Sequence, residues 1–155
     1  MHVRRASSND LQAIASLWMG LARYHEPKSS YFELAPGAER KFASYVRRLM
    51  KRKDVAVFVA QKNSELVGYL IAKIKEEKPV FKLRKRGHIT DLFVEKDYRR
   101  QGIGRKLVKE ALAWFRSRNL QFVEISVYVK NISGKIAWKR MGFKEHMTVM
   151  RRKLR

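Results

Sequence analysis

The residues best suited to chemistry form a glycine-bearing, arginine-rich segment, Val94-Glu95-Lys96-Asp97-Tyr98-Arg99-Arg100-Gln101-Gly102-Ile103-Gly104-Arg105. A run typical of a strand, 88–94, precedes it, and an amphipathic run, 103–116, follows it. Glycines let a backbone approach a ligand closely and leave N–H groups pointing outward, and the start of a helix adds partial positive charge. A strand, such a turn and then a helix is typical of a diphosphate-binding site.

The glycine spacing excludes two common phosphate-binding loops. A P-loop requires a Gly-Lys-Ser/Thr sequence, and none follows here. The dinucleotide-binding fingerprint requires a third glycine at a fixed spacing and an opening strand near the N-terminus, and this segment has neither. On this segment alone, an ordinary basic turn between a strand and a helix is an equal alternative.

A second segment, Asn131–Phe143, begins with asparagine and ends in Gly-Phe, where the glycine is expected to end a helix. Together, Arg99-x-x-Gly102-x-Gly104 and this segment resemble the acyl-CoA loop and a later helix of the GNAT acetyltransferase superfamily. The resemblance covers essentially the whole chain and implies a single GNAT domain over 1–155. The implied fold is mixed α/β (α+β), with one mixed central sheet of six to seven strands, four flanking helices, and a splay between the fourth and fifth strands.

The resemblance implies an N-acetyltransferase that uses acetyl-CoA as co-substrate and no metal. The acceptor would be a primary amine, on a small molecule, a protein N-terminus or a lysine, which attacks directly in a ternary complex. In the family, backbone groups of the fourth strand bind the thioester carbonyl, a role that the resemblance assigns here to the main chain of Phe93 and Val94, and the splay admits the pantetheine arm. The residues expected to contact acetyl-CoA are Leu92, Phe93, Val94, Arg99, Arg100, Gln101, Gly102, Ile103, Gly104, Arg105, Asn131 and Trp138.

Two of these residues have alternative roles. Trp138 stands where many family members carry a tyrosine that is proposed to protonate the leaving thiolate. An indole N–H can donate a hydrogen bond but is no practical acid, so Trp138 either packs against the thioester or fills the core. Asn131 either contacts the pantetheine arm or caps a helix, and the two roles are compatible.

The resemblance does not assign the general base, because Thr90 and Ser126 occupy the positions where some members carry glutamate. Nearby candidates are His88, Asp91 and Glu124, and loss of the proton to water is the alternative. His88 has the best intrinsic pKa for the role. Strict strand alternation would place His88 and Asp91 on opposite faces of the sheet.

The acceptor is expected to lie near Tyr31-Phe32-Glu33-Leu34, because this segment closes over the acceptor in the family. Tyr31 and Glu33 are the candidate substrate contacts, since a carboxylate could hold an ammonium group. A solvated lid turn is the alternative.

The elements expected to position these residues follow from apolar periodicity. Helices are predicted over 10–25, 38–52, 103–117 and 132–141, with Asp10 as the cap of the first. Strands are predicted over 3–6, 55–60, 66–74, 88–94 and 122–129, with a last strand or hairpin over 143–154. The charged segment 76–86 is predicted to be a loop or exposed hairpin.

Composition limits the class of protein. The chain has 155 residues, 45% of them hydrophobic, which is enough for a core. It has no cysteine, which excludes disulfides, thiolate zinc sites and a cysteine nucleophile. Without a secretory signal or an apolar run of membrane-spanning length, we expect a cytoplasmic protein with no membrane partner.

The charge is extreme, with 36 Lys and Arg against 14 Asp and Glu, a formal net charge of +22. Coenzyme A needs only a few of these cations. One alternative function is therefore a catalytically weakened GNAT-fold module that binds RNA or the ribosome. A solvated basic surface is favoured over a nucleic-acid partner, because no aromatic-interleaved signature accompanies the basic runs. A homodimer is compatible with the sequence.

Overall fold

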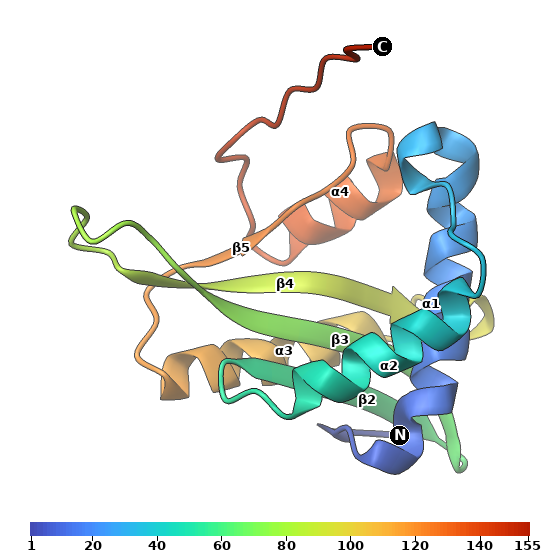
Figure 1. The fold of residues 1–155 in the computed structure, drawn as a ribbon. Helices are drawn as coiled ribbons and strands as arrows, with labels where there is room; N and C mark the ends of the chain where they lie inside the picture. Colours follow the sequence, from blue (N-terminus) through green and yellow to red (C-terminus); the bar gives the residue numbers. More distant parts are fainter.

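The computed structural model describes residues 1–155, which form one five-stranded sheet with helices on both faces (Figure 1). The strand order is β1-β2-β3-β4-β5. The first four strands are antiparallel neighbours: β1 (His2–Arg5), β2 (Val55–Lys62), β3 (Glu65–Glu76) and β4 (Lys85–Val94). The last strand, β5 (Val123–Ile125), runs parallel to β4.

Two helices cover one face of the sheet and a third covers the other (Figure 1). α1 (Leu11–His25) and α2 (Ala38–Met50) share the first face, α3 (Ile103–Ser117) covers the second, and α4 (Ile132–Arg140) lies beside β5. Short 3₁₀ turns occupy Ser8–Asp10, Glu26–Lys28, Ser30–Phe32 and Lys96–Tyr98. None of the helices is both long and apolar enough to cross a membrane.

Burial on both faces explains the nearly continuous apolar run of β2. Val55, Val57 and Val59 pack into the cluster under α1 and α2. Ala56 and Phe58 pack into the cluster under α3. Because successive side chains of a strand point to opposite faces, a central strand between two layers has no polar side.

A close approach sets α1 against β4. Gly20 of α1 lies over the Phe93 ring, and a Cβ at this glycine would come within 2.6 Å of that ring. The absence of a side chain therefore lets α1 pack directly on the strand that carries the candidate site.

The helices and first four strands agree with the predicted ranges within a few residues, and 77–84 forms the predicted exposed hairpin turn between β3 and β4. The predicted strand or hairpin over 143–154 is wrong, so the sheet has five strands rather than six to seven. Glu145 pairs with Lys135 and Lys139 of α4, and residues 144–155 are exposed and pair with no strand, so they add nothing to the sheet.

The predicted fifth strand, 122–129, is also too long, because only Val123–Ile125 pairs with β4. Ile125 is opposite Ile89, so the next residue of β4 in that register is Thr90. Thr90 is the extra residue of a β-bulge against β3. The bulge interrupts the β4 edge and ends the pairing, so the two strands separate there.

Asp10 is the N-cap residue of α1, as predicted, but its side chain makes no capping hydrogen bond to the helix. Its carboxylate instead accepts two hydrogen bonds from the Arg4 guanidinium, at 2.7 and 2.9 Å, and one from the Ser7 backbone N–H. These bonds lower the pKa of Asp10 to about 2, with the Arg4 hydrogen bond as the largest cause. Asp10 therefore joins β1 to the start of the first helix.

Candidate functional site

The glycine-bearing loop between β4 and α3 presents a set of free backbone donors. Gly102 precedes the first residue of α3 with a φ of 77°, and Arg100 has a φ of 64°. The first N–H of the helix with a backbone acceptor is that of Lys106, which donates to the Gly102 carbonyl. The N–H groups of 100–105 donate to no other group of the chain. They form a cradle that suits a diphosphate.

The arginine side chains of this loop divide into two kinds. The Arg99 Nε donates to the Val94 carbonyl at 2.8 Å, and its guanidinium lies over the Phe93 ring. Arg99 therefore braces the loop against the end of β4. Arg100 and Arg105 are exposed and form no ion pair, so both are available to an anion.

The end of β4 beyond Ile89 has an open edge facing away from β3. The Glu95 N–H donates to the Val67 carbonyl on β3. Since antiparallel strands alternate their N–H directions, Phe93 also donates toward β3, whereas Leu92 and Val94 point their N–H groups to the open edge. Of the two residues whose backbone was expected to bind the thioester carbonyl, Phe93 and Val94, only Val94 points its N–H to the open edge.

The bulge at Thr90 brings the candidate bases onto one face, which corrects the prediction that His88 and Asp91 face opposite ways. His88 is opposite Lys73 and Asp91 is opposite Ile71, on the α1/α2 face of β3. Glu124 of β5 is opposite His88 and shares its face. His88 and Glu124 therefore lie side by side just before β4 and β5 separate, and Asp91 lies on the same face just beyond that point.

His88 is held neutral at physiological pH. Burial, with Lys75 as the next cause, lowers the pKa of His88 to about 4. Its Nδ1 is buried without a hydrogen-bond partner. A group with so low a pKa is a weak proton acceptor near neutrality.

The lowered pKa of His88 predicts a pH dependence of stability. Below its unfolded pKa of ~6.5, the unfolded chain takes up a proton that the folded chain resists, so stability falls as pH drops from there toward about 4. His88→Gln should reduce this dependence. Thermal melts of both proteins across that range measure it, and an identical slope in the two would contradict the assignment.

Asp91 belongs to a polar group that the sequence did not reveal. The buried Tyr69 O–H donates to the Asp91 carboxylate at 3.2 Å. Burial raises the pKa of Asp91, partly offset by hydrogen bonds from Thr90 and Tyr69 and by the charge of Lys73. The Lys73 ammonium donates to the Tyr45 hydroxyl of α2. These partners are far apart in sequence, and only Asp91 lies close to the glycine-bearing segment. No pattern in the sequence therefore indicates that they form a group.

Glu124 is committed to an ion-pair group. The Arg86 Nε donates to the Glu124 carboxylate at 2.6 Å, and the same guanidinium pairs with Glu77. A proton acceptor paired in this way is less available than Asp91, whose partner is a neutral hydroxyl.

Asn131 caps α4 and also meets α1. Its Oδ1 accepts hydrogen bonds from the Gly134 N–H and the Tyr24 O–H, both at 3.0 Å. The Tyr24 hydroxyl also lies 3.3 Å from the Ser133 hydroxyl. With its oxygen engaged, the Asn131 amide N–H₂ is free to donate to a ligand. Tyr24 is a candidate site residue that the sequence did not reveal, because it lies at the end of an otherwise ordinary amphipathic helix.

Trp138 is partly buried and packs against the core on the α3 side. Its ring meets that of Phe143 edge-on at 5.1 Å, and it contacts the buried cluster under α3. Leu92 and Val94 contact the same cluster, whereas Phe93 belongs to the cluster under α1 and α2.

The expected lid residues have different surroundings. Phe32 packs against Tyr128, with ring centroids 5.0 Å apart, which joins the lid to the segment after β5. Tyr31 is 61% exposed, with the Arg151 guanidinium over its ring. Glu33 is exposed and forms no ion pair.

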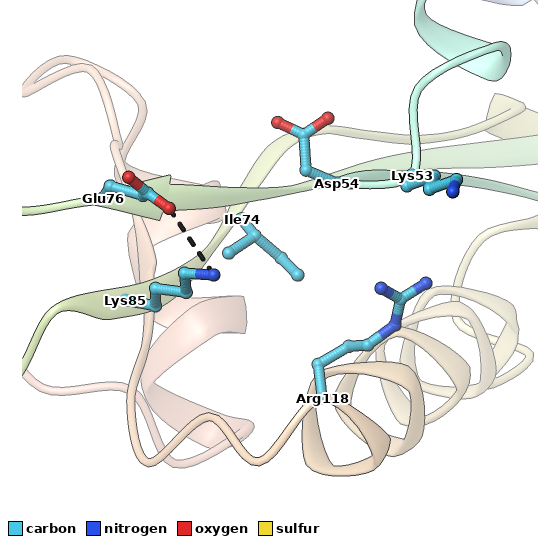
Figure 2. A pocket seen from close by; sticks show the side chains of 6 residues that line it. All are labelled: Lys53, Asp54, Ile74, Glu76, Lys85 and Arg118. Atoms are coloured by element: carbon cyan, nitrogen blue, oxygen red, sulfur yellow. Dashed lines mark ion pairs between the residues drawn. The ribbon is translucent and has the colours of Figure 1, made fainter.

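Two surface hollows lie away from the loop. One, of about 380 Å³, is lined by Arg40, Lys41, Ser44 and Arg48 of α2. The other, of about 270 Å³, lies by the C-terminal end of α3, with Ile74 at its centre and Lys85 paired to Glu76 (Figure 2). No group of three or more His, Cys, Asp or Glu side chains is placed to hold a metal ion.

The comparisons with known proteins agree on one family. The model of the acetyltransferase (GNAT) family matches residues 12–143. A Methanocaldococcus jannaschii protein named uncharacterized N-acetyltransferase is 27% identical over 95% of this chain, which spans 62% of that relative's length. An uncharacterized N-acetyltransferase of Archaeoglobus fulgidus is 31% identical over 82% of each chain. An N-alpha-acetyltransferase of Sulfurisphaera tokodaii is 33% identical, over 62% of this chain and 60% of the relative.

Solved structures share the fold at low identity. A tetramutant of the BH1408 protein from Bacillus halodurans superposes with a TM-score of 0.90 at 20% identity, covering 99% of this chain and all of the other. The aminoglycoside N-acetyltransferase AAC(6')-Iy in complex with CoA superposes at 0.80 with 15% identity, covering 99% of this chain and 94% of the other.

Proposed function

The chain belongs to the GNAT family of acetyltransferases, and we propose that it transfers the acetyl group of acetyl-CoA to a primary amine. The observation that carries this proposal is the cradle of free N–H groups at 100–105, on a loop with the glycines and arginines of an acyl-CoA site. The relatives named as acetyltransferases and the CoA complex of a protein with this fold support it. They give no support to a binding module for RNA or the ribosome.

Three parts of this chain would hold acetyl-CoA. The N–H groups of 100–105, with Arg100 and Arg105, would bind the pyrophosphate. The open edge of β4 would pair with the pantetheine arm, and the Asn131 amide would donate to it. The Val94 N–H would bind the carbonyl oxygen as it gains negative charge. When bound, acetyl-CoA supplies an activated acetyl group on a good leaving thiolate.

Asp91 is the base we favour. It would take the proton that the acceptor ammonium must lose before its nitrogen forms the new bond to the acetyl carbon, as the carbon–sulfur bond breaks. His88 is disfavoured by its low pKa, and Glu124 by its pair with Arg86. Burial raises the pKa of Asp91 and so strengthens it as an acceptor. Tyr69 would hold the carboxylate in place.

The proposal is tested by thiol release. The purified chain is incubated with acetyl-CoA and a panel of small amines, lysine peptides and peptides with free N-termini, and free coenzyme A thiol is measured. We expect release that depends on both acetyl-CoA and at least one amine class. Release at the amine-free background across the whole panel would overturn the proposal.

Trp138 should contribute more to stability than to turnover. Trp138→Phe keeps an aromatic ring beside Phe143 but leaves part of the packing space empty, so we expect a loss of ~1–3 kcal/mol in unfolding free energy. We expect kcat to change by less than about threefold, since an indole supplies no acid for the thiolate. Denaturant melts and steady-state rates measure both. A tenfold fall in kcat with unchanged stability would instead place Trp138 at the thioester.

A further inference from the structure

The outward face of α2 carries cations that no acid of the chain neutralises. Arg40, Lys41, Arg47, Arg48 and Lys51 take part in none of the ion pairs of the structure. They repeat at about one-turn intervals over the exposed side of α2, with Lys41 and Arg48 on the flank next to Tyr45. We call these five residues the α2 basic face.

Part of the α2 basic face is hollowed. The cavity of about 380 Å³ is lined only by Arg40, Lys41, Arg48 and the Ser44 hydroxyl. The second hollow, by the C-terminal end of α3, is lined by both signs of charge. It contains the acids Asp54 and Glu76 as well as cations, and the cation Lys85 is already paired with Glu76 (Figure 2). Charge complementarity therefore favours an anionic occupant at α2 and not at the second hollow.

The α2 basic face leads to the proposed reaction site. Tyr45 lies on the same side of α2 as Lys41 and Arg48, one turn from each. Its hydroxyl accepts a hydrogen bond from Lys73, and the Lys73 charge acts on Asp91. The hydrogen bond from Arg52, and to a smaller extent the charge of Lys73, lowers the pKa of Asp54, so this acid is close to Lys73 but already paired with Arg52. Glu124 is paired with Arg86. An acceptor entering along this route would meet positive charge next to the base.

We propose that the α2 basic face binds the acidic residues that follow the acceptor amine, so that the preferred acceptor is the N-terminal α-amine of an acidic peptide. This inference rests on the proposed acetyl transfer. Lys41 and Arg48 are two turns of α2 apart, or ~11 Å along the helix. About three extended residues of a bound peptide would span that distance. With the amine at Asp91, the residues that follow it would pass Lys73 and Tyr45 and continue to Lys41 and Arg48. Attraction would raise the association rate and fix the direction of the peptide.

A peptide comparison tests the preference. Three peptides of equal length share the first residue and a free α-amine, and carry acidic, neutral or basic residues at the next five positions. Acetylation is followed by thiol release, and binding by fluorescence anisotropy of labelled peptides. We expect kcat/KM to be about tenfold higher for the acidic than for the neutral peptide and lowest for the basic one. The difference should shrink as salt is raised.

Matched charge reversals locate the effect. Lys41→Glu with Arg48→Glu reverses two cations of the α2 basic face. Lys109→Glu with Arg116→Glu makes the same changes, at the same spacing, on the exposed side of α3. The α2 pair should lose the preference for the acidic peptide and raise kcat/KM for the basic one. The α3 pair should retain the wild-type order, with KM for acetyl-CoA similar in both.

Several results would overturn the inference. The first is an equal kcat/KM for the acidic and basic peptides in the wild type. The second is an equal effect of the two charge reversals on the peptide preference. The third is an oligonucleotide that binds the α2 basic face without competing with the acidic peptide. Acetylation of all peptides without an acid preference would overturn the inference and leave the proposed function standing. Acid-selective peptide binding that needs Lys41 and Arg48, without thiol release, would support the surface and contradict the proposed function.

Discussion

Gly102→Val should weaken acetyl-CoA binding by about 100-fold, as expected if one or two charge-assisted hydrogen bonds are lost. Gly102 has a φ of 77°, a conformation that costs a residue with a Cβ ~1–2 kcal/mol. The Cβ itself would meet no protein atom within 4 Å, so it would project into the space in front of the cradle. The side chain would then both occupy that space and shift the N–H groups. Calorimetric titration of acetyl-CoA into the variant measures the loss.

Gly104→Ala is the matched control for this variant. A Cβ at Gly104 would lie 3.8 Å from Val94 and 3.9 Å from Leu92, which is ordinary packing distance. Its φ is not in the left-handed region, so the alanine brings no strain. Affinity should stay within about threefold of the wild type. Unchanged affinity in Gly102→Val, with the fold intact, would show that acetyl-CoA does not bind this loop.

Asp91→Asn should lower kcat/KM by about 10²–10⁴-fold, the contribution typical of a positioned general base. The amide keeps the size of the carboxylate and can still accept the Tyr69 hydrogen bond. Stability should not fall. Because burial raises the pKa of Asp91, its ionised form costs folding free energy above the unfolded pKa, and a neutral amide removes that cost. Rates and thermal melts at neutral pH separate the two effects.

His88→Gln and Glu124→Gln serve as controls for the base. Both should retain the wild-type pH profile above pH ~6, since an imidazole with a pKa of about 4 is already neutral there. If kcat/KM of the wild type rises with pH around ~6.5, and this rise disappears in His88→Gln, then His88 is the base. If Asp91→Asn is as active as the wild type, the proton is lost to solvent, and the chain contributes mainly alignment.

Local features of the sequence predicted most of the fold. Glycine positions fixed the start of α3 and the end of α4, and apolar periodicity located the four helices and the first four strands. The cradle followed from Gly102 and Gly104, because backbone conformation depends strongly on residue type at such turns. These signals are local, so they can be recognised without knowing what packs against them.

Features that depend on tertiary contacts were missed. The bulge at Thr90 leaves no mark in a strand of ordinary composition, yet it reverses the alternation and moves His88 onto the face of Asp91. It also ends the pairing of β5, which periodicity alone extended to residue 129. Tyr24 and Tyr69 became recognisable only through their partners, which lie 107 and 22 residues away in the chain.

Direct identification of the product tests the central claim. The chain is incubated with acetyl-CoA labelled with deuterium in the acetyl group and with the best acceptor amine from the thiol-release panel. Mass spectrometry should find one labelled acetyl group on the amine nitrogen and one equivalent of free coenzyme A. Gly102→Val should suppress both products. Thiol release without label on the amine, or label transferred equally without the enzyme, would contradict the assignment of this chain as an N-acetyltransferase.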